Sequence, residues 1–333
     1  MNRAIRFHRL VLALLIGTAA SFAHAAAEPL LELTATIALP LVKGRIDHLD
    51  VDRSGQRLFV AALANNSVEV IDIATHRRTQ SVQGFGEPQG LAYVPDSDRL
   101  YVASGSANQV DVLEGASLAR LQPITGLDDA DNVRYDVGRR AVIIGYGKGA
   151  LRIVEAQTGQ TVGDIALAGH PESFQMEQRG SRVFVNVPSA GNVTVVDRVE
   201  RKAVGTWPVP GARANFPMAL DEGNRRLFVG TRSPARMLVY DIDSGQVVAT
   251  LPIGGDTDDI FVDSQRKRVY VICGEGRVDI FRMEGRRQYV KEGSIPTAPR
   301  ARTGLFVPEN GMLYIAAPAT AVDDARVLVY RAR

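Results

Sequence analysis

The fold is decided by residues 57–72, whose sequence is RLFVAALANNSVEVID. A compact apolar run, LFV at positions 58–60, is followed ten residues later by the alternating run VEV at positions 68–70. Strict alternation of this kind gives a strand one buried face and one exposed face. The two runs therefore predict neighbouring antiparallel strands of one small sheet.

The same pattern recurs along the chain at a nearly constant interval. Residues equivalent to Leu58 are, in order, Leu58, Leu100, Val142, Val183, Leu227, Val269 and Leu313. Their spacings are 42, 42, 41, 44, 42 and 44 residues. An apolar strand and a turn precede each run, for example at 90–97, and a fourth, weaker strand follows, for example at 246–251. Four antiparallel strands per repeat are typical of a propeller blade, so we expect an all-β, seven-bladed β-propeller.

The two ends of the chain are expected to close the ring. The last repeat ends with its third strand, residues 326–330, and lacks a fourth strand. A spare strand lies at residues 31–39 and stops at Pro40, which cannot continue a hydrogen-bonded ladder. We expect this N-terminal strand to close the last blade, because that pairing removes an exposed sheet edge.

The repeat text resembles the YVTN β-propeller family. The resemblance rests on RLFVA at 57–61 with NNSVEVID at 65–72, and on RLYVA at 99–103 with VDV at 110–112. It covers residues 30–333 and implies an extracytoplasmic seven-bladed propeller that works as a binding or scaffold protein. The family is broad in function, so no reaction follows from it.

Residues 1–25 are typical of a secretory signal peptide. Three arginines precede an apolar stretch at 10–20, and AHA at 23–25 has the small-x-small pattern of a cleavage site. We therefore expect a soluble protein, periplasmic or secreted, in which residues 26–333 form a single propeller domain. No later hydrophobic run is long enough to span a membrane.

Composition excludes several other classes of function. One cysteine cannot form an internal disulfide, and no motif for covalent haem attachment is present. The whole chain has 39 basic and 37 acidic residues; removing the three arginines of the leader leaves 36 and 37, a charge of −1. A nucleic-acid partner is therefore not expected. The partners that we expect are a small molecule, a peptide or a periplasmic protein, bound by a monomer.

Chemistry is expected where the innermost strands begin, because their entry segments ring the mouth of the central channel. When the repeats are aligned on Leu58 and its equivalents, ionisable residues recur in these entry segments thirteen, eleven and ten residues before the aligned position. The candidates for binding a ligand are Arg45, Asp47, His48, Gln89, Asn132, Arg213, Arg300 and Arg302. The candidates for binding a metal are Asp129, Asp131, His170, Glu172 and Asp258.

Three interpretations of these residues stay open. Arg45, Arg300 and Arg302 come from neighbouring blades and could bind an anionic group, since the guanidinium fork suits carboxylates and phosphates. The acids and His170 could instead hold a divalent cation, the only cofactor indicated. The charges could also solvate the channel and pair between blades, for example Arg300 with Asp256 or Asp258.

Two functions follow from these interpretations. We expect an exported, non-catalytic binding or scaffold protein with a polar ligand or partner site at the channel mouth. The alternative is a metal-dependent, lactonase-like hydrolase in which Asp131, Asn132, Glu172 and Asp258 act as ligands, by analogy with gluconolactonase-like propellers. No nucleophile elbow, zinc-protease motif or phosphate loop supports an enzyme.

Overall fold

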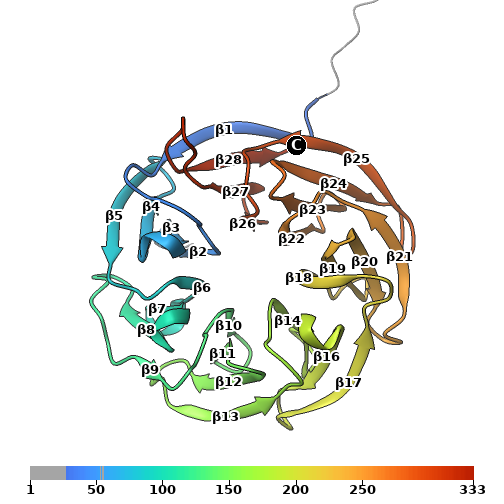
Figure 1. Ribbon diagram of the computed structural model, residues 1–333, viewed down its shortest axis with the longest axis horizontal. Helices are drawn as coiled ribbons and strands as arrows, with labels where there is room; N and C mark the ends of the chain where they lie inside the picture. The colour runs from blue at the N-terminus through green and yellow to red at the C-terminus, as the bar shows by residue number, and fades with distance from the viewer. Residues whose placement is uncertain (1–27, 53, 55) are drawn as a thin grey trace, which may run out of the picture.

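Seven four-stranded antiparallel sheets are arranged as blades around a central channel (Figure 1). The computed structural model describes residues 28–52, 54 and 56–333. The predicted all-β, seven-bladed propeller is confirmed. The predicted signal peptide at residues 1–25 lies outside the described residues.

The first six blades use consecutive strands, with the first strand of each blade innermost (Figure 1). From the centre outward, the first blade consists of β2 (Leu49–Asp52), β3 (Arg57–Ala62), β4 (Ser67–Asp72) and β5 (Arg77–Gln83), and the second of β6 (Pro88–Val94), β7 (Arg99–Ser104), β8 (Gln109–Glu114) and β9 (Ile124–Thr125). The third consists of β10 (Val133–Asp136), β11 (Ala141–Tyr146), β12 (Ala150–Glu155) and β13 (Thr161–Ala166), and the fourth of β14 (Phe174–Met176), β15 (Arg182–Val187), β16 (Asn192–Asp197) and β17 (Lys202–Pro208). The fifth consists of β18 (Arg213–Asp221), β19 (Arg226–Ser233), β20 (Ala235–Asp241) and β21 (Val247–Pro252), and the sixth of β22 (Thr257–Asp263), β23 (Arg268–Cys273), β24 (Arg277–Met283) and β25 (Tyr289–Pro296).

The helical segments of the described chain are single 3-10 turns between strands. They are η1 (Leu63–Asn65), η2 (Pro95–Ser97), η3 (Gly105–Ala107) and η4 (Pro188–Ala190). None of these described segments could span a lipid bilayer.

The seventh blade is built from both ends of the chain. Its innermost strands are β26 (Thr303–Val307), β27 (Met312–Ala317) and β28 (Arg326–Ala332), and β1 (Leu31–Ala38) is outermost. β1 pairs antiparallel with β28, from Leu31 opposite Ala332 to Ala38 opposite Arg326 (Figure 1). The predicted closure is confirmed.

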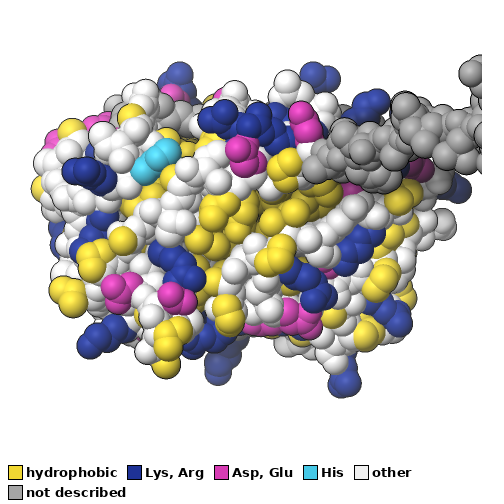
Figure 2. All heavy atoms as spheres, turned by 90° about the horizontal axis from the view of Figure 1, so that it is seen from above, with side chains coloured by type: hydrophobic (Ala, Val, Ile, Leu, Met, Phe, Trp, Pro, Cys, Tyr) yellow, Lys and Arg dark blue, Asp and Glu magenta, His cyan; other side chains and the backbone are white. Residues whose placement is uncertain are grey.

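Apolar side chains between neighbouring blades hold the ring together. Tyr270 of β23 packs against Phe306 of β26 with ring centroids 5.2 Å apart. Between the fourth and fifth blades, Trp207 stacks on Tyr240 with centroids 5.9 Å apart, and it also contacts Phe184 of its own blade. Burial of such surface contributes about 25 cal/mol per Å². Figure 2 shows the side wall, with hydrophobic side chains at mid-height and lysine and arginine side chains along both rims.

The loops distinguish two faces of the ring. The upper face carries the loops that lead from one blade into the first strand of the next, and the lower face carries the turns between the first and second strands. Because the first strands line the channel, the residues at their two ends surround its two openings (Figure 1). We call these openings the upper mouth and the lower mouth.

Candidate functional site

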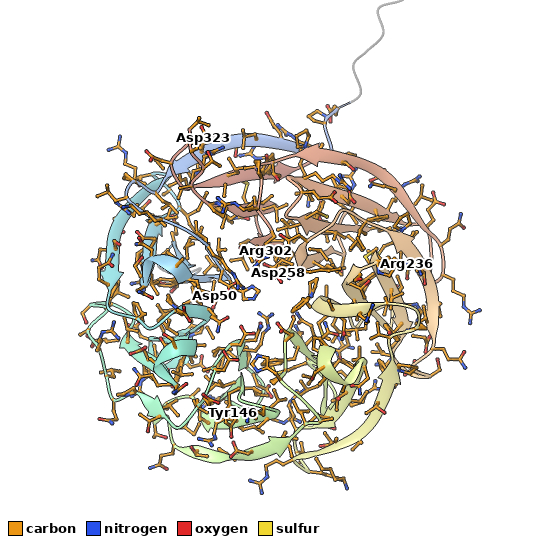
Figure 3. All side chains as sticks on the ribbon, in the orientation of Figure 1. Asp50, Tyr146, Arg236, Asp258, Arg302 and Asp323 are labelled. Carbon is orange, nitrogen blue, oxygen red and sulfur yellow. The ribbon has the colours of Figure 1, made fainter. Side chains whose placement is uncertain are left out.

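The upper mouth gathers more carboxylates than guanidinium groups. Its acids are Asp47, Asp131, Glu172, Asp258 and Asp259, and their basic neighbours are Arg45, Arg232, Arg302, His48 and His170. They come from the entry segments of the blades and from the end of β19. In Figure 3, Arg302 and Asp258 lie next to each other beside the channel.

Two arginines clamp the carboxylate of Asp258. Arg232 Nη2 lies 2.7 Å from one carboxylate oxygen, and Arg302 Nε lies 2.9 Å from the other. Arg302 also donates to Asp256 at 2.8 Å. Burial raises the pKa of Asp258 to about 6, Arg232 lowers it, and the charge of Asp47 raises it further. The clamp thus holds a carboxylate in a site that is already rich in negative charge.

A histidine of the first blade reaches an aspartate of the sixth. His48 Nδ1 lies 3.5 Å from Asp259 Oδ2, and the backbone N–H of Gly304, in the blade between them, donates to the same oxygen at 2.9 Å. A Cβ on Gly304 would lie 2.4 Å from the carbonyl oxygen of Tyr314, so only glycine allows this approach. Burial lowers the pKa of His48, but the charge and hydrogen bond of Asp259 dominate and raise it to about 10.

Three side chains of the third and fourth blades form a compact cluster with mixed ligand atoms. One imidazole nitrogen of His170 and one carboxylate oxygen each of Asp131 and Glu172 all lie within 4.8 Å of one another. His170 Nδ1 lies 2.7 Å from the carbonyl oxygen of Gly147, and His170 Nε2 lies 3.7 Å from Asp131 Oδ2. A backbone carbonyl commonly orients metal-binding histidines in this way.

The electrostatics of this cluster favour a bound cation. Burial, followed by the charge of Asp131, raises the pKa of Glu172 to about 8. Interaction with Asp131 outweighs burial and, with the Gly147 carbonyl, raises the pKa of His170 to about 9. Part of each shift thus comes from the negative charge of Asp131, which a bound cation would offset.

The other predicted binding residues lie around this centre. Arg45 pairs with Asp47 at 3.0 Å, and Gln89 donates to the carbonyl oxygen of Ala130 at 3.4 Å, which ties the second blade to the third. Asn132 Oδ1 accepts a hydrogen bond from Arg134 at 3.3 Å. The side chains of Arg45, Gln89 and Asn132, which we expected to bind a ligand, therefore already have partners within the protein.

The predicted arginine arc is only partly assembled. Arg302, not Arg300, pairs with Asp256 and Asp258, while Arg300 donates to the carbonyl oxygen of Ala319 at 2.7 Å. Arg300 has a φ of 65°, a left-handed backbone conformation. The suggested pairing of Arg300 with Asp256 or Asp258 is therefore wrong, and Arg302 makes it instead.

Two more predicted residues lie at the edge of the mouth. Arg213 is exposed at the start of β18, and Asp129 is an exposed neighbour of His170, with Asp129 Oδ2 3.7 Å from His170 Nδ1. The structure brings Asp129 to the cluster and leaves Arg213 outside it.

Sequence reasoning missed two arginines. Arg232 lies at the end of β19, and its guanidinium stacks on Phe216 at 4.1 Å before reaching Asp258. Arg134 lies on β10, two residues after Asn132, and lines the channel. The period of two along a strand places Arg134 on the face of Asn132, which was the available signal. For Arg232 no such signal exists, since it comes from a second strand.

Below the upper mouth the channel narrows to a waist. All seven blades line a cavity of about 50 Å³ here, with His48, Asn132, Arg134 and Asp259 among its polar residues. This volume suits one or two water molecules.

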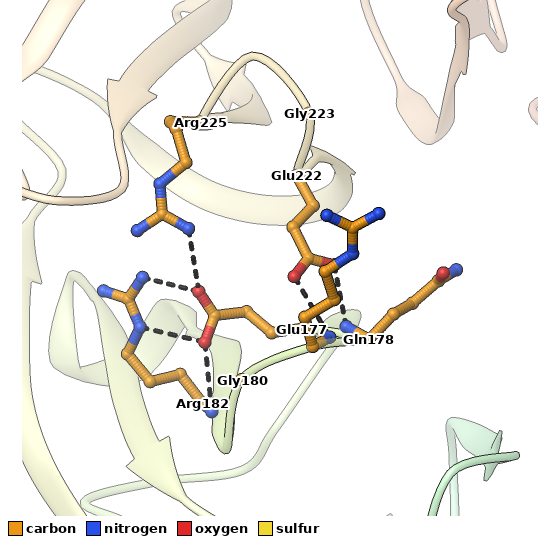
Figure 4. A pocket seen from close by; sticks show the side chains of 8 residues that line it. Glu177, Gln178, Gly180, Arg182, Glu222, Gly223 and Arg225 are labelled. Atoms are coloured by element: carbon orange, nitrogen blue, oxygen red, sulfur yellow. Dashed lines mark hydrogen bonds and ion pairs between the residues drawn. The ribbon is translucent and has the colours of Figure 1, made fainter.

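A larger cavity of about 680 Å³ lies away from the channel, between the lower turns of the fourth and fifth blades (Figure 4). Its acids already have partners. Glu177 binds Arg182 at 2.6 Å and Arg225 at 3.4 Å, and Glu222 accepts the backbone N–H groups of Gln178 and Arg179. These contacts join two blades, so the polar residues of this cavity have a structural role.

Comparisons with known proteins show the fold and no more. No family model and no curated protein matches the sequence. A chain from Kuenenia stuttgartiensis hydrazine synthase is similar, with a TM-score of 0.74 and 17% identity over 84% of this chain and 98% of that one. A chain from a crystal structure of the mitotic checkpoint complex is similar, with a TM-score of 0.77 and 14% identity over 98% of this chain and 99% of that one. At such identities, the chain is a β-propeller whose function must be argued from its own residues.

Proposed function

We propose that this chain is an exported, non-catalytic binding propeller, of the YVTN type that its repeats resemble, and that a divalent cation at the upper mouth anchors its ligand. The observation that carries the proposal is the cluster of Asp131, His170 and Glu172, with ligand atoms within 4.8 Å of one another. Two carboxylates and an imidazole suit Mn²⁺ or Zn²⁺ better than the all-oxygen sites of Ca²⁺ and Mg²⁺.

A cation at this cluster connects to binding in a simple way. Three protein ligands leave coordination positions open, and a carboxylate or phosphate of a small molecule, peptide or periplasmic partner could complete them. The arginines of the mouth are less available for this task, because Arg45 and Arg302 already pair with carboxylates. The rigid ring presents this site between loops of several blades, as in many binding propellers.

The test is titration of the metal-free mature protein with Mn²⁺, followed by calorimetry and by the electron paramagnetic resonance signal of free Mn²⁺. We expect one site per chain and at least tenfold weaker binding in Asp131→Asn and in His170→Ala, since each removes a ligand. Asp164→Asn is the matched control, because this acid on β13 pairs with Arg152 away from the channel. Equal Mn²⁺ affinity in all four proteins would refute the site.

The hydrolase alternative depends on a larger ligand set than the structure presents. Asn132 Oδ1 is engaged by Arg134, and both carboxylate oxygens of Asp258 are held by arginines. We therefore favour binding without turnover. Hydrolysis of a lactone panel by the Mn²⁺-loaded protein, lost in Glu172→Gln, would contradict the non-catalytic part of the proposal and leave the metal site intact.

A further inference from the structure

The lower mouth of the channel opens into a cavity of about 390 Å³ that no part of the proposed function uses. Its volume is in the range of small-molecule sites. Side chains of four blades form apolar walls around it, namely Leu49, Leu91, Val133, Leu305, Tyr93 and Tyr135. The two tyrosine hydroxyl groups donate to Asp98 and Asp96, both at 2.8 Å, so each tyrosine side chain is held by a hydrogen bond.

Arg134 lies at the inner end of this cavity, where it also lines the waist. Its guanidinium donates to the carbonyl oxygen of Phe174 at 3.2 Å and to Asn132 Oδ1 at 3.3 Å. Within the described part of the chain, no carboxylate lies within the 4.0 Å of an ion pair with it. Arg134 therefore has two neutral hydrogen-bond partners and no counter-charge in contact.

The acids of the lower mouth have their own partners. Asp52 accepts two hydrogen bonds from Arg57, at 3.0 and 2.6 Å, and one from Ser54. Asp50 accepts the backbone N–H of Tyr93 at 2.6 Å; Figure 3 shows Asp50 beside the channel. Among the described residues that line the cavity, Arg134 supplies the positive charge, and it shares the lining with the engaged carboxylates of Asp50 and Asp52. Burial lowers the pKa of Arg134 although Asp259, Asp50 and Asp131 act in the opposite direction.

We propose that the lower mouth binds an organic carboxylate with a compact apolar or aromatic body, whose carboxylate pairs with Arg134. A guanidinium can hold a carboxylate through two parallel hydrogen bonds, and the leucine and tyrosine walls offer the body a dry surface. The ligand is expected to enter from the lower face, where this cavity lies. This site shares no residue with the cation cluster of the upper mouth and stands independently of it.

The experiment compares three probes by calorimetry on the mature protein: 3-phenylpropanoate, its uncharged amide and acetate. We expect 3-phenylpropanoate to bind at least tenfold more tightly than the amide, which lacks the charge, and than acetate, which lacks the body. Arg134→Gln should remove the preference for the acid over the amide. Arg266→Gln is the matched control, an arginine on the lower face that pairs with Asp263 outside the cavity.

Two further measurements keep the test decisive if Arg134→Gln does not fold. Val137 lines the rim of the cavity and is 70% exposed, so Val137→Glu should fold and should weaken binding of the acid at least threefold through repulsion. In the wild-type protein, the Nε–Hε resonance of Arg134 should shift with the acid and not with acetate. Equal binding of acid and amide, or an Arg134 resonance that ignores the acid, would overturn the proposal.

Discussion

Replacing His48 with glutamine should flatten the pH dependence of folding stability between pH 7 and 9. In the folded protein, His48 Nδ1 lies 3.5 Å from Asp259 Oδ2, and the His48 side chain is 16% exposed. Burial disfavours its charged form, but Asp259, then Asp47 and Asp258, outweigh burial and raise the pKa of His48 to about 10 from 6.5. The folded chain therefore holds a proton that the unfolded chain releases.

The sign and the slope follow from this difference. The stabilisation from protonated His48 is fully present below pH 6.5 and is lost as the pH rises through 10. Between these limits the folded state binds one more proton than the unfolded state, which costs about 1.4 kcal/mol of stability per pH unit. From pH 7 to pH 9 the wild-type protein should thus lose about 2–3 kcal/mol that the glutamine variant does not lose.

Urea unfolding at half-unit pH steps, followed by circular dichroism, measures both slopes. Subtracting the profile of His48→Gln from that of the wild type cancels the titration of groups common to both proteins. His76→Gln is the matched control, because this histidine lies in the outer turn between β4 and β5. Parallel profiles for the wild type and His48→Gln would refute the reasoning, and an equal flattening in His76→Gln would show that the effect is not specific to the channel.

Three further substitutions test the contacts that hold the upper mouth and the closing blade together. Arg302→Gln removes one of the two arginine partners of buried Asp258. Because Arg232 remains, the free energy of unfolding should fall by about 2 kcal/mol, less than the roughly 3–5 kcal/mol expected for a buried charge left without any partner. Thermal unfolding of this variant, of Asp258→Asn and of the double variant measures the coupling between the two residues. Ile37 of the closing strand β1 is 1% exposed, so Ile37→Asp places a charge in the core. This variant should lose more than about 4 kcal/mol of folding stability and should aggregate, which light scattering detects. Gly304→Ala forces a Cβ to 2.4 Å from the carbonyl oxygen of Tyr314 and should lower stability by about 1–3 kcal/mol in urea unfolding.

The fold could be predicted almost completely from the sequence because the repeat is a strong local signal. The period near 42 residues locates every blade, and the alternating run after each turn identifies the third strand. The closing strand was also predictable, since residues 31–39 supply the one strand that the last repeat lacks, and β1 begins at Leu31 as expected. Local pattern and ring closure point to one architecture.

The site was less predictable than the fold. Aligning the repeats predicts where a residue lies along the channel axis, but it does not predict the direction in which its side chain points. Asp129, Asp256 and Arg300 occupy equivalent positions, and all three have left-handed φ angles, of 47°, 54° and 65°. The outcome differs between the blades: Asp256 and Asp258 both contact Arg302, whereas Arg300 donates to the carbonyl oxygen of Ala319. Arg232 reaches the mouth from a different strand and could not be found by aligning entry segments.

The two mouths of one channel hold charges that a purely structural channel would pair with each other. The charge of Arg134 interacts with Asp131 and Asp259, yet neither comes within the 4.0 Å of an ion pair, and at the upper mouth the charge of Asp47 adds to the burial that raises the pKa of Asp258. Buried charge without a partner lowers stability, and the packed interfaces between blades are what allow the ring to tolerate it. Rigid strands keep the carboxylate cluster of the upper mouth apart from Arg134, which lines both the waist and the lower cavity. The two proposals use this arrangement, with a cation beside the carboxylates of the upper mouth and an organic carboxylate beside Arg134.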